Sequence, residues 1–239
     1  SAANSIMLGA DLIKSGRCDV VVAGGSECLT RYHLNGFNSL KILDSEPCRP
    51  FDATRNGLNL GEGAGFVVLE SEEHALNRGV APIGALDGYG NACDAFHQTA
   101  SSDDGEGAFL AMSKALNMSG LKPGDIDYVN AHGTATPNND ASESRAMIRL
   151  FGDKIPPVSS TKAFTGHTTS AAGSIEAVIC LLAIRHGFIP ANLNWKEPFD
   201  GGVVPDAEGH QDVRLDHVLC NSFGFGGNDS SLLISRYGK

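Results

Sequence analysis

His132 is the first residue whose setting could support chemistry. Residues 127–130 predict a strand, and the histidine follows it in a loop of glycine and threonines that ends at Pro137. Catalytic groups of α/β proteins often lie in such loops at the ends of strands. A loop histidine can also do no more than hydrogen-bond to the backbone, and this segment by itself favours that plainer interpretation.

A second cluster combines a lysine with another histidine. Lys162 lies among small uncharged residues, and Glu176 is the only charged residue between it and Arg185. A lysine in such a setting is expected to be partly desolvated or paired. His167 directly precedes a predicted helix over 168–186, which is apolar enough to be buried, so Glu176 within it needs a partner. We favour a structural ion pair for this carboxylate.

The third cluster is rich in glycine. Residues 221–228 have the sequence Asn-Ser-Phe-Gly-Phe-Gly-Gly-Asn, and glycines allow backbone N–H groups to approach a ligand closely. A phosphate-binding loop is one interpretation, but its usual Gly-Lys-Ser/Thr ending is absent. The glycines of residues 61–65 do not match the dinucleotide-binding pattern, and they precede a strand instead of following one. A dinucleotide site is therefore unsupported.

Composition and charge exclude several classes of protein. Of the 239 residues, 41% are hydrophobic and 19% are charged, which excludes a disordered chain. The net charge of −10 argues against binding to nucleic acid or to an anionic membrane. The apolar run over residues 177–184 is too short to cross a bilayer, and no signal peptide is visible. We therefore expect a cytoplasmic location.

The cysteines lie too far apart along the chain to form a CxxC pair or a zinc-finger pattern. Several of them lie within apolar stretches. We expect reduced, buried thiols of a cytosolic protein and no metal site. The residues concerned are Cys18, Cys28, Cys48, Cys93, Cys180 and Cys220.

Strands and helices alternate along the chain, which predicts an α/β fold of layered helices and sheets. The apolar runs 19–25 and 66–69 are interpreted as buried parallel strands, because neither alternates with polar residues. Ser71 with two glutamates behind it is typical of a helix start. Further helices are expected at 108–118, 140–150 and 168–186, and further strands at 127–130, 218–221 and 232–235.

The chain begins directly with a predicted helix. Ile6, Ala10 and Ile13 have helical spacing and Gly16 follows as a stop, so the helix starts within a few residues of Ser1. A domain seldom opens on a buried helix, since termini normally lie at the surface. We therefore expect this chain to be a piece of a longer protein.

Together the three clusters resemble the β-ketoacyl-acyl-carrier-protein synthases of the thiolase superfamily. The motifs occur in the order Asn-Ala-His-Gly-Thr, then Ser-Thr-Lys with Thr-Gly-His, then Asn-Ser-Phe-Gly-Phe-Gly-Gly. The resemblance covers essentially the whole chain and implies a thiolase-like layered αβαβα fold, of which this chain would be about the C-terminal 60%. Residues 1–88 would complete the first half of the synthase, and residues 89–239 would form its second half.

The resemblance implies a decarboxylating Claisen condensation that gives a 3-oxoacyl-acyl-carrier protein, in fatty acid, polyketide or polyene synthesis. An active-site cysteine holds the acyl group, malonyl on a carrier protein loses carbon dioxide, and the carbanion attacks the acyl thioester. His132 and His167 match the two catalytic histidines, whose N–H groups would stabilise the developing negative charge. Lys162 matches the lysine that holds this polar network in place. No metal or organic cofactor is implied.

Four more residues take their expected roles from the same resemblance. Thr134 and Thr136 match residues that bind the pantetheine arm, Phe225 matches a gate at the acyl pocket, and Glu176 matches a structural acid. The implied partners are an acyl carrier protein and either a second copy of the chain or a related ketosynthase subunit.

The front of the chain departs from the family pattern. The family's nucleophilic cysteine would stand immediately before Ser1, and none of the six cysteines matches its position. We therefore expect the nucleophile in a missing N-terminal segment, on a separate chain or in preceding sequence. Two alternatives stay open: a binding or scaffold fragment without turnover, and a non-catalytic partner subunit like the chain-length factors, which lack this cysteine. The retention of His132, Lys162 and His167 argues against the partner subunit.

Overall fold

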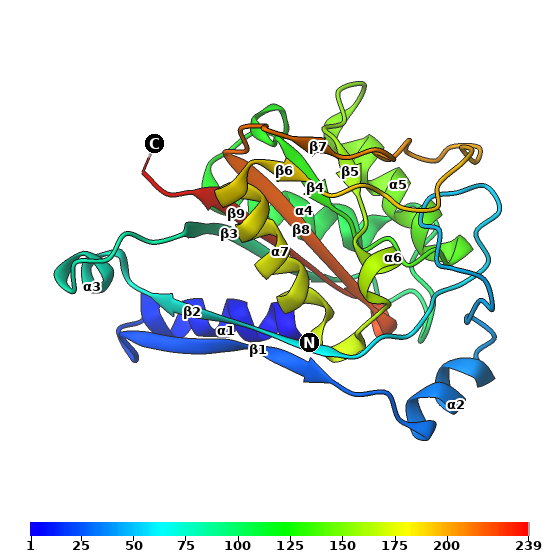
Figure 1. Cartoon of the computed structure of the whole chain (residues 1–239), viewed down its shortest axis with the longest axis horizontal. Coiled ribbons are helices and arrows are strands. Elements are labelled where there is room, and N and C mark those ends of the chain that lie inside the picture. Colours follow the sequence, from blue (N-terminus) through cyan, green and yellow to red (C-terminus); the bar gives the residue numbers. More distant parts are fainter. Residues whose placement is uncertain (239) are drawn as a thin grey trace.

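The computed structural model describes residues 1–238, which form stacked layers of sheets and helices (Figure 1). The described elements, in chain order, are α1 (Ala2–Lys14), β1 (Val20–Glu27), α2 (Arg31–Ser39), β2 (Gly63–Glu70), α3 (Glu72–Asn77), β3 (Gly84–Cys93), α4 (Glu106–Ser119), η1 (Pro123–Asp125), β4 (Tyr128–Asn130), α5 (Pro137–Phe151), β5 (Val158–Ser159), α6 (Lys162–Thr165), η2 (Thr169–Ala171), α7 (Ala172–His186), β6 (Phe188–Ile189), β7 (His210–Gln211), β8 (His217–Gly224), η3 (Phe225–Gly227) and β9 (Asn228–Arg236).

The larger sheet has five strands in the order β3-β9-β8-β4-β5. β4 runs parallel to β5 and β8, whereas β9 is antiparallel to β3 and β8. Successive residues of β8 point to opposite faces: Val218 packs in the core around α7, and Leu219 packs in the core around α4 and α5. The sheet therefore separates two hydrophobic cores, as expected for a layered α/β fold.

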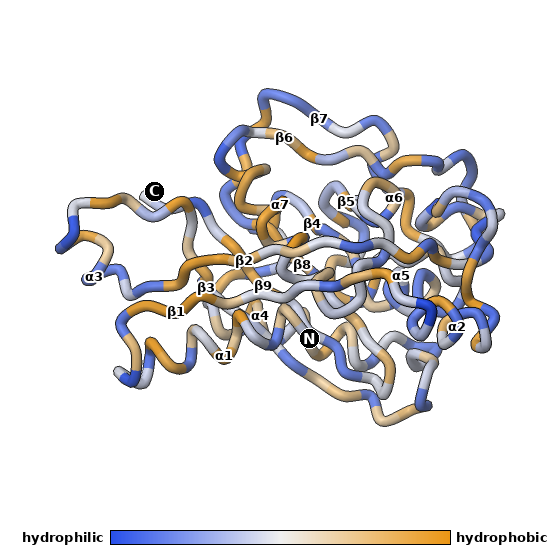
Figure 2. Tube along the Cα trace, turned by 60° about the horizontal axis from the view of Figure 1, so that its bottom comes forward, coloured by the Kyte–Doolittle hydropathy of each residue, from blue (hydrophilic) through white to orange (hydrophobic). Residues whose placement is uncertain are grey.

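The smaller sheet pairs β1 with β2, and the two strands run side by side as a largely hydrophobic ribbon (Figure 2). The prediction of buried parallel strands is wrong here, because the pair is antiparallel and one of its faces is exposed in the described residues. Ala23 faces α1 and the core, whereas Val22 and Phe66 are 67% and 55% exposed on the outer face. An antiparallel sheet commonly packs only one face, and a continuous apolar run does not reveal this.

Helices α1 and α7 lie between the two sheets and approach each other closely. A Cβ atom added at Gly173 of α7 would come within 3.0 Å of the Cβ and backbone N of Ala3, and 2.7 Å of the Ser222 hydroxyl. Ala2 and Ala3 are almost fully buried at this contact. Small residues at the starts of both helices therefore set how near α1 can come to α7.

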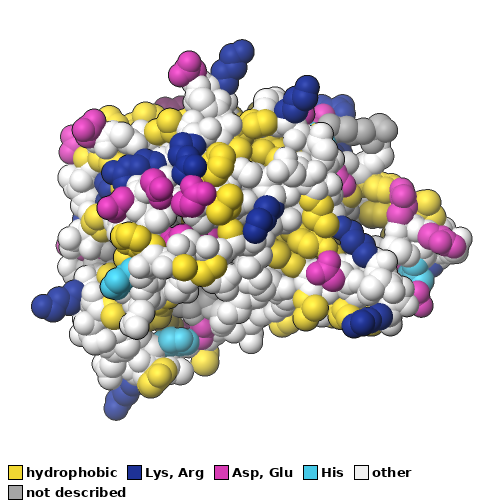
Figure 3. All heavy atoms as spheres, turned by 180° about the vertical axis from the view of Figure 1, so that it is seen from behind, with side chains coloured by type: hydrophobic (Ala, Val, Ile, Leu, Met, Phe, Trp, Pro, Cys, Tyr) yellow, Lys and Arg dark blue, Asp and Glu magenta, His cyan; other side chains and the backbone are white. Residues whose placement is uncertain are grey.

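β3 is one continuous strand of the five-stranded sheet, although its pairing with β9 shifts register between Leu86 and Gly88. The boundary after residue 88 expected from the sequence falls inside this strand. A short pair, β6 with β7, forms a third sheet. No helix within residues 1–238 is long and apolar enough to cross a membrane. On the face seen in Figure 3, acidic and basic side chains are interspersed with hydrophobic ones.

Candidate active site

His132 lies just beyond the end of β4, one of the inner strands of the five-stranded sheet. Its side chain is buried, with 6% of the residue exposed. The backbone N–H groups of His132 and Gly133 donate to the two carboxylate oxygens of Glu143, each over 2.9 Å. Glu143 belongs to α5, so one buried carboxylate on this helix fixes the backbone of the loop that carries the histidine.

His167 lies between α6 and η2, and its backbone is held by the segment before β2. Its N–H donates to the carbonyl of Asn59 over 2.7 Å, and its carbonyl accepts from the N–H of Gly61 over 3.1 Å. The Nδ1 atom of its ring accepts a hydrogen bond from the backbone N–H of Thr169 over 3.2 Å. A neutral imidazole that accepts at Nδ1 carries its proton on Nε2, so His167 offers an Nε2–H donor.

The two imidazoles meet edge to face. Their ring centroids are 5.3 Å apart, and the ring planes make an angle of 81°. The ring of Phe223 lies 5.8 Å from that of His132 and covers it from the β8 side. The Nδ1 atom of His132 is buried and has no hydrogen-bond partner among residues 1–238. The sequence separates the two histidines, and the fold brings them together.

Lys162 and Glu176 bind each other next to this histidine pair. The Lys162 Nζ atom is 2.5 Å from Oε1 of Glu176, and the residues are 1% and 2% exposed. The lysine and the carboxylate for which the sequence offered no partner thus form a buried ion pair. Burial raises the pKa of Glu176, which the positive charge of Lys162 opposes.

The same lysine charge acts on both imidazoles. Burial and then the positive charge of Lys162 lower the pKa of His167 to about 3. Burial, Lys162 and the neighbouring His167 lower the pKa of His132 well below its usual value. Both rings are therefore neutral near pH 7, so each has one N–H donor and one unprotonated nitrogen.

The amino end of α1 lies near this pair. The Ser1 nitrogen lies close enough to both His132 and His167 for a charge at this position to act on them. The close contact of Ala3 with Gly173 holds this end of the helix against the start of α7. A group attached at the amino end of α1 would therefore lie beside the imidazoles.

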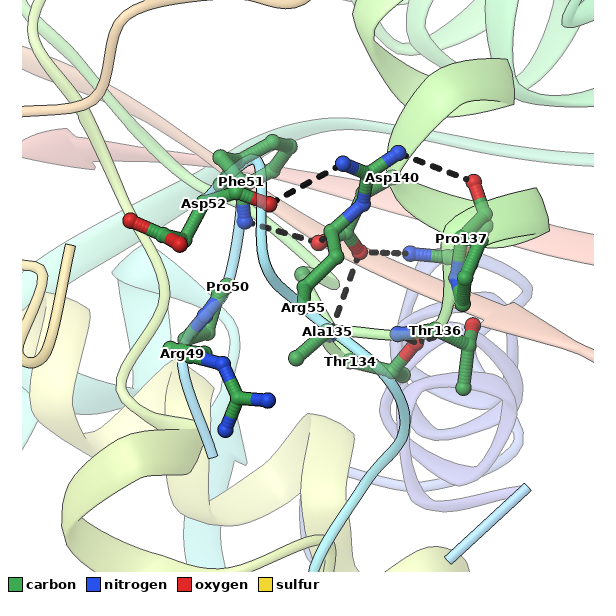
Figure 4. A network of polar contacts seen from close by, with 12 residues as sticks. Arg49, Pro50, Phe51, Asp52, Arg55, Thr134, Ala135, Thr136, Pro137 and Asp140 are labelled. Carbon is green, nitrogen blue, oxygen red and sulfur yellow. Dashed lines mark hydrogen bonds and ion pairs between the residues drawn. The ribbon is translucent and has the colours of Figure 1, made fainter. Parts of the chain in front are cut away.

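Thr134 and Thr136 lie in the loop between His132 and α5, and their hydroxyl oxygens are 2.8 Å apart. The intervening Ala135 has a left-handed backbone with φ of 65°, which is uncommon for a residue other than glycine. Asp140 stabilises it, because its carboxylate accepts the N–H of Ala135 over 3.2 Å and that of Phe51 over 2.7 Å (Figure 4).

Arg55 closes this network on its outer side. Its Nε atom lies 3.7 Å from the Asp140 carboxylate, and its other nitrogens donate to the carbonyls of Asp52 and Pro137 (Figure 4). The guanidinium also covers the ring of Phe199 at 3.5 Å. The loop with the two threonines is thus tied to the segment before β2 by one carboxylate and one guanidinium.

Phe225 lies apart from the histidines, on the glycine-rich turn between β8 and β9. It is 48% exposed, and its ring stacks against that of Phe37 of α2 at a centroid distance of 6.0 Å. The next two residues, Gly226 and Gly227, have φ of 76° and 69°. A Cβ atom at Gly227 would collide with the carboxylate of Asp94. Phe223, which the sequence did not single out, is the phenylalanine that contacts His132.

Three carboxylates that hold the site escaped the sequence analysis: Glu143, Asp140 and Glu27. Their partners are mostly backbone N–H groups, which leave no mark in a sequence. The spacing of Asp140 and Glu143 by three positions, at the start of a helix that follows the histidine loop, is the one signal available for two of them.

The six cysteines are all free thiols. Cys48, Cys180 and Cys220 are buried as expected, but Cys28 and Cys93 are exposed. Burial raises the pKa of Cys48 to about 12, and a hydrogen bond with Cys180 together with burial raises that of Cys220 far above its usual value. A raised thiol pKa opposes formation of the nucleophilic thiolate, so neither cysteine is suited to attack a thioester.

Comparison with known proteins assigns the family. The model of the β-ketoacyl synthase N-terminal domain matches residues 1–75, and that of the C-terminal domain matches residues 83–196. The chain is 42% identical, over 98% of its length, to the mitochondrial 3-oxoacyl-[acyl-carrier-protein] synthase of Arabidopsis thaliana, and it covers 54% of that protein. It is 44% identical, over 95% of its length, to 3-oxoacyl-[acyl-carrier-protein] synthase 2 of Rhizobium meliloti, of which it covers 56%.

Solved structures agree. The ishigamide ketosynthase/chain length factor superposes with a TM-score of 0.94 at 37% identity, over 99% of this chain and 59% of that one. A type II polyketide ketosynthase, solved in complex with its acyl-carrier protein, superposes with a TM-score of 0.93 at 29% identity. The match covers 99% of this chain and 61% of that ketosynthase. The chain thus spans little more than half the length of the curated relatives described here. It belongs to the β-ketoacyl synthase family and has the thiolase-like fold of the ketosynthases.

Proposed function

We propose that this chain supplies the decarboxylation machinery of a 3-oxoacyl-acyl-carrier-protein synthase, an acyltransferase that condenses an acyl thioester with malonyl-acyl-carrier protein. The observation that carries the proposal is the pair of neutral imidazoles, with centroids 5.3 Å apart, beside the cation of Lys162. The curated relatives named above are 3-oxoacyl-[acyl-carrier-protein] synthases, which supports the same reaction.

The histidines act in the step that makes the carbon nucleophile. Loss of carbon dioxide breaks the bond between the malonyl carboxylate and the α-carbon, and its electron pair passes into an enolate whose oxygen becomes negative. N–H groups of His132 and His167 stabilise that oxygen. The enolate carbon attacks the acyl carbonyl and the thiolate leaves. Burial, helped by the positive charge of Lys162, keeps both imidazoles neutral, and the same charge, held by Glu176, favours the negative charge of the enolate.

Three further residues bind the substrates in this proposal. The hydroxyl groups of Thr134 and Thr136 hydrogen-bond the pantetheine arm of the carrier protein, and Asp140 holds their loop in place. Phe225 controls access to the acyl pocket. Its half-exposed ring and the two adjacent glycines with positive φ allow the turn to change conformation at low cost.

The acyl-carrying thiol is placed at the amino end of α1, in sequence preceding Ser1 or on another chain. A helix N-terminus lowers the pKa of a thiol, because the helix dipole favours the thiolate. The nearness of the Ser1 nitrogen to both histidines supports this placement. Residues 1–88 would then complete the first half of the synthase, and residues 89–239 would form the second half.

The partners in the proposal are an acyl carrier protein and a second ketosynthase subunit, either identical or related, in the cytoplasm. Helix α2 supports the subunit contact. None of its residues is buried, and Tyr32 and Leu34 are 87% and 51% exposed. Large apolar side chains on an exposed helix are typical of surfaces that pair with another protein.

The deciding experiment measures release of carbon dioxide from malonyl-acyl-carrier protein. It uses this chain together with the segment or second chain that carries the acyl-accepting thiol. His132→Ala and His167→Ala should abolish decarboxylation but leave transfer of the acyl group to the thiol measurable. His74→Ala, which changes a histidine paired with Glu70 on the surface, is the control. Decarboxylation at the wild-type rate in either site variant would overturn the proposed role and favour the non-catalytic partner subunit.

Intact-protein mass spectrometry tests the placement of the thiol. The 239-residue chain alone should gain no acyl adduct from acyl-acyl-carrier protein, because the raised pKa values of the Cys48 and Cys220 thiols oppose thiolate formation and none of the six cysteines stands at the amino end of α1. Addition of the preceding segment should give one adduct on a cysteine of that segment. A stable adduct on one of the six cysteines, with product formed, would contradict this placement.

A further inference from the structure

Glu27, the last residue of β1, makes an unusual number of hydrogen bonds to one short turn. Its Oε2 atom accepts the backbone N–H of Ser170 over 3.2 Å, the Ser170 hydroxyl over 2.7 Å and the Thr169 hydroxyl. Its Oε1 atom accepts the N–H of Cys28 and lies 3.2 Å from Nδ1 of His33. The Glu27 side chain is 9% exposed.

Most of these donors belong to η2, the turn that follows His167. Burial works against the charge of Glu27, but the hydrogen bonds from Thr169 and Ser170 outweigh it and lower the pKa of this carboxyl to about 2. The carboxylate is therefore ionised at neutral pH. Charge-assisted hydrogen bonds of this kind are shorter and stronger than those between neutral groups.

Thr169 needs such support. Its φ is 34°, a left-handed conformation that a β-branched residue rarely adopts and that persists only where its surroundings hold it. The N–H of the same residue donates to Nδ1 of His167. A relaxed turn would remove this donor, and either nitrogen of the neutral ring could then carry the proton.

We propose that Glu27 is a positioning residue that holds the turn of Thr169 and Ser170 in place against His167 and thereby fixes His167 as the Nε2–H tautomer. The residue acts through Thr169 and does not touch the substrate. The catalytic meaning of the tautomer rests on the function proposed above, but the tautomer itself can be measured without turnover.

The experiment records two-bond ¹H–¹⁵N correlation spectra of the full 239-residue chain with ¹⁵N-labelled histidine at pH 7. These spectra show which ring nitrogen carries the proton. The wild-type signal of His167, identified by its loss in His167→Asn, should be that of the pure Nε2–H form. Glu27→Ala should lower the ratio of Nε2–H to Nδ1–H about tenfold or more. Glu27→Gln keeps an acceptor oxygen and should rescue most of the ratio.

Glu62→Gln is the matched control. Glu62 also accepts a backbone N–H, that of Leu29, but within residues 1–238 no hydrogen bond or ion pair joins its side chain to the turn after His167. Signals of His74 and His217 report whether the fold is intact. If Glu27→Ala fails to fold, Thr169→Ala removes one hydroxyl donor to the carboxylate and should lower the ratio in the same direction.

The outcomes separate the two proposals. A pure Nε2–H signal in folded Glu27→Ala, or in Thr169→Ala where that variant replaces it, would overturn the positioning role and leave the proposed function untouched. A mixed tautomer with decarboxylation at the wild-type rate in the complete protein would support the positioning role and contradict the part given to His167 in catalysis.

Discussion

The two histidines are held by glutamates in opposite ways. Glu143 lies within the protein beneath the His132 loop, and its carboxylate accepts the N–H groups of His132 and Gly133. Burial outweighs these bonds and raises the pKa of Glu143 to about 7. Glu27 lies nearer the surface beside the His167 turn, where hydrogen bonds outweigh burial and lower its pKa to about 2.

The difference shows that a carboxylate can fix backbone geometry whether the site favours or opposes its charge. At Glu143 the cost of burial exceeds the gain from its donors, and the nearby charge of Asp140 adds to that cost. At Glu27 two hydroxyl groups add to the backbone donors and reverse the balance. The two supports should therefore respond oppositely to pH.

Removal of the Lys162 charge, which acts on both histidines, should have the largest effect on stability. Lys162→Met leaves the buried carboxylate of Glu176 without a partner, so we expect a loss of about 3–5 kcal/mol in the free energy of unfolding, measured by chemical denaturation. The double variant Lys162→Met/Glu176→Leu should recover most of it, because both charges are then gone. Lys154→Met, at an exposed lysine, is the control. A loss below about 1 kcal/mol in the single variant would contradict a buried, unscreened pair.

The pH dependence of stability sharpens the comparison. Glu143 has a raised pKa, so its contribution is present below its usual pKa of 4.5 and is lost as pH rises through about 7, by about 3 kcal/mol. Glu27 has a lowered pKa, so its contribution is present above 4.5 and is lost as pH falls towards 2. Glu143→Gln should remove the first slope, and Glu27→Gln the second.

Denaturation curves are recorded for wild type and both variants between pH 3 and pH 8 at fixed salt. The difference in unfolding free energy between wild type and each variant, plotted against pH, gives the slope that the variant removes. Asp229, whose pKa burial raises to about 8, contributes equally to the alkaline side in wild type and Glu27→Gln. Glu143→Gln also removes a charge that helps to raise the pKa of Asp229, so part of its alkaline change belongs to Asp229. If both variants lost the same slope, the contrast between the two glutamates would be wrong.

The smallest expected change in stability concerns Phe225. Its ring is half exposed and stacks against Phe37 of α2, a helix with no buried residue. Phe225→Ala should therefore lower the free energy of unfolding by about 1 kcal/mol or less. In the complete enzyme the same variant should change the accepted acyl chain length or the order of the two half-reactions. Phe164→Ala, at another exposed phenylalanine, is the control. Unchanged chain-length preference and unchanged kinetics in Phe225→Ala would contradict the gating role.

The sequence predicted the candidate catalytic residues better than it predicted the carboxylates that hold them. The order of the motifs identified His132, Lys162 and His167, which come from three separate segments and meet in the fold. It also showed that Lys162 and Glu176 both needed partners, since each stands among uncharged residues. It could not show that they bind each other, because sequence separation says nothing of distance across a core.

The errors have physical causes. The valines of β1 were interpreted as buried, but a continuous apolar run has the same pattern whether one face is packed or both. Glu143 and Glu27 were missed because many of their donors are backbone N–H groups, which every residue except proline carries, and because the side-chain donors lie far away in the sequence. Exposed Cys28 and Cys93 were assigned to the interior because cysteine is usually buried.

The contact between Gly173 and Ala3 has a consequence for which substitutions the site tolerates. A methyl group at position 173 would push against the Cβ and backbone of Ala3, and so move the first turn of α1 away from α7. Substitution by alanine there would alter no ionisable group and no hydrogen-bonding side chain. In the proposed arrangement it would nevertheless change the distance between a thioester at the start of α1 and the two histidines, although only one carbon atom is added.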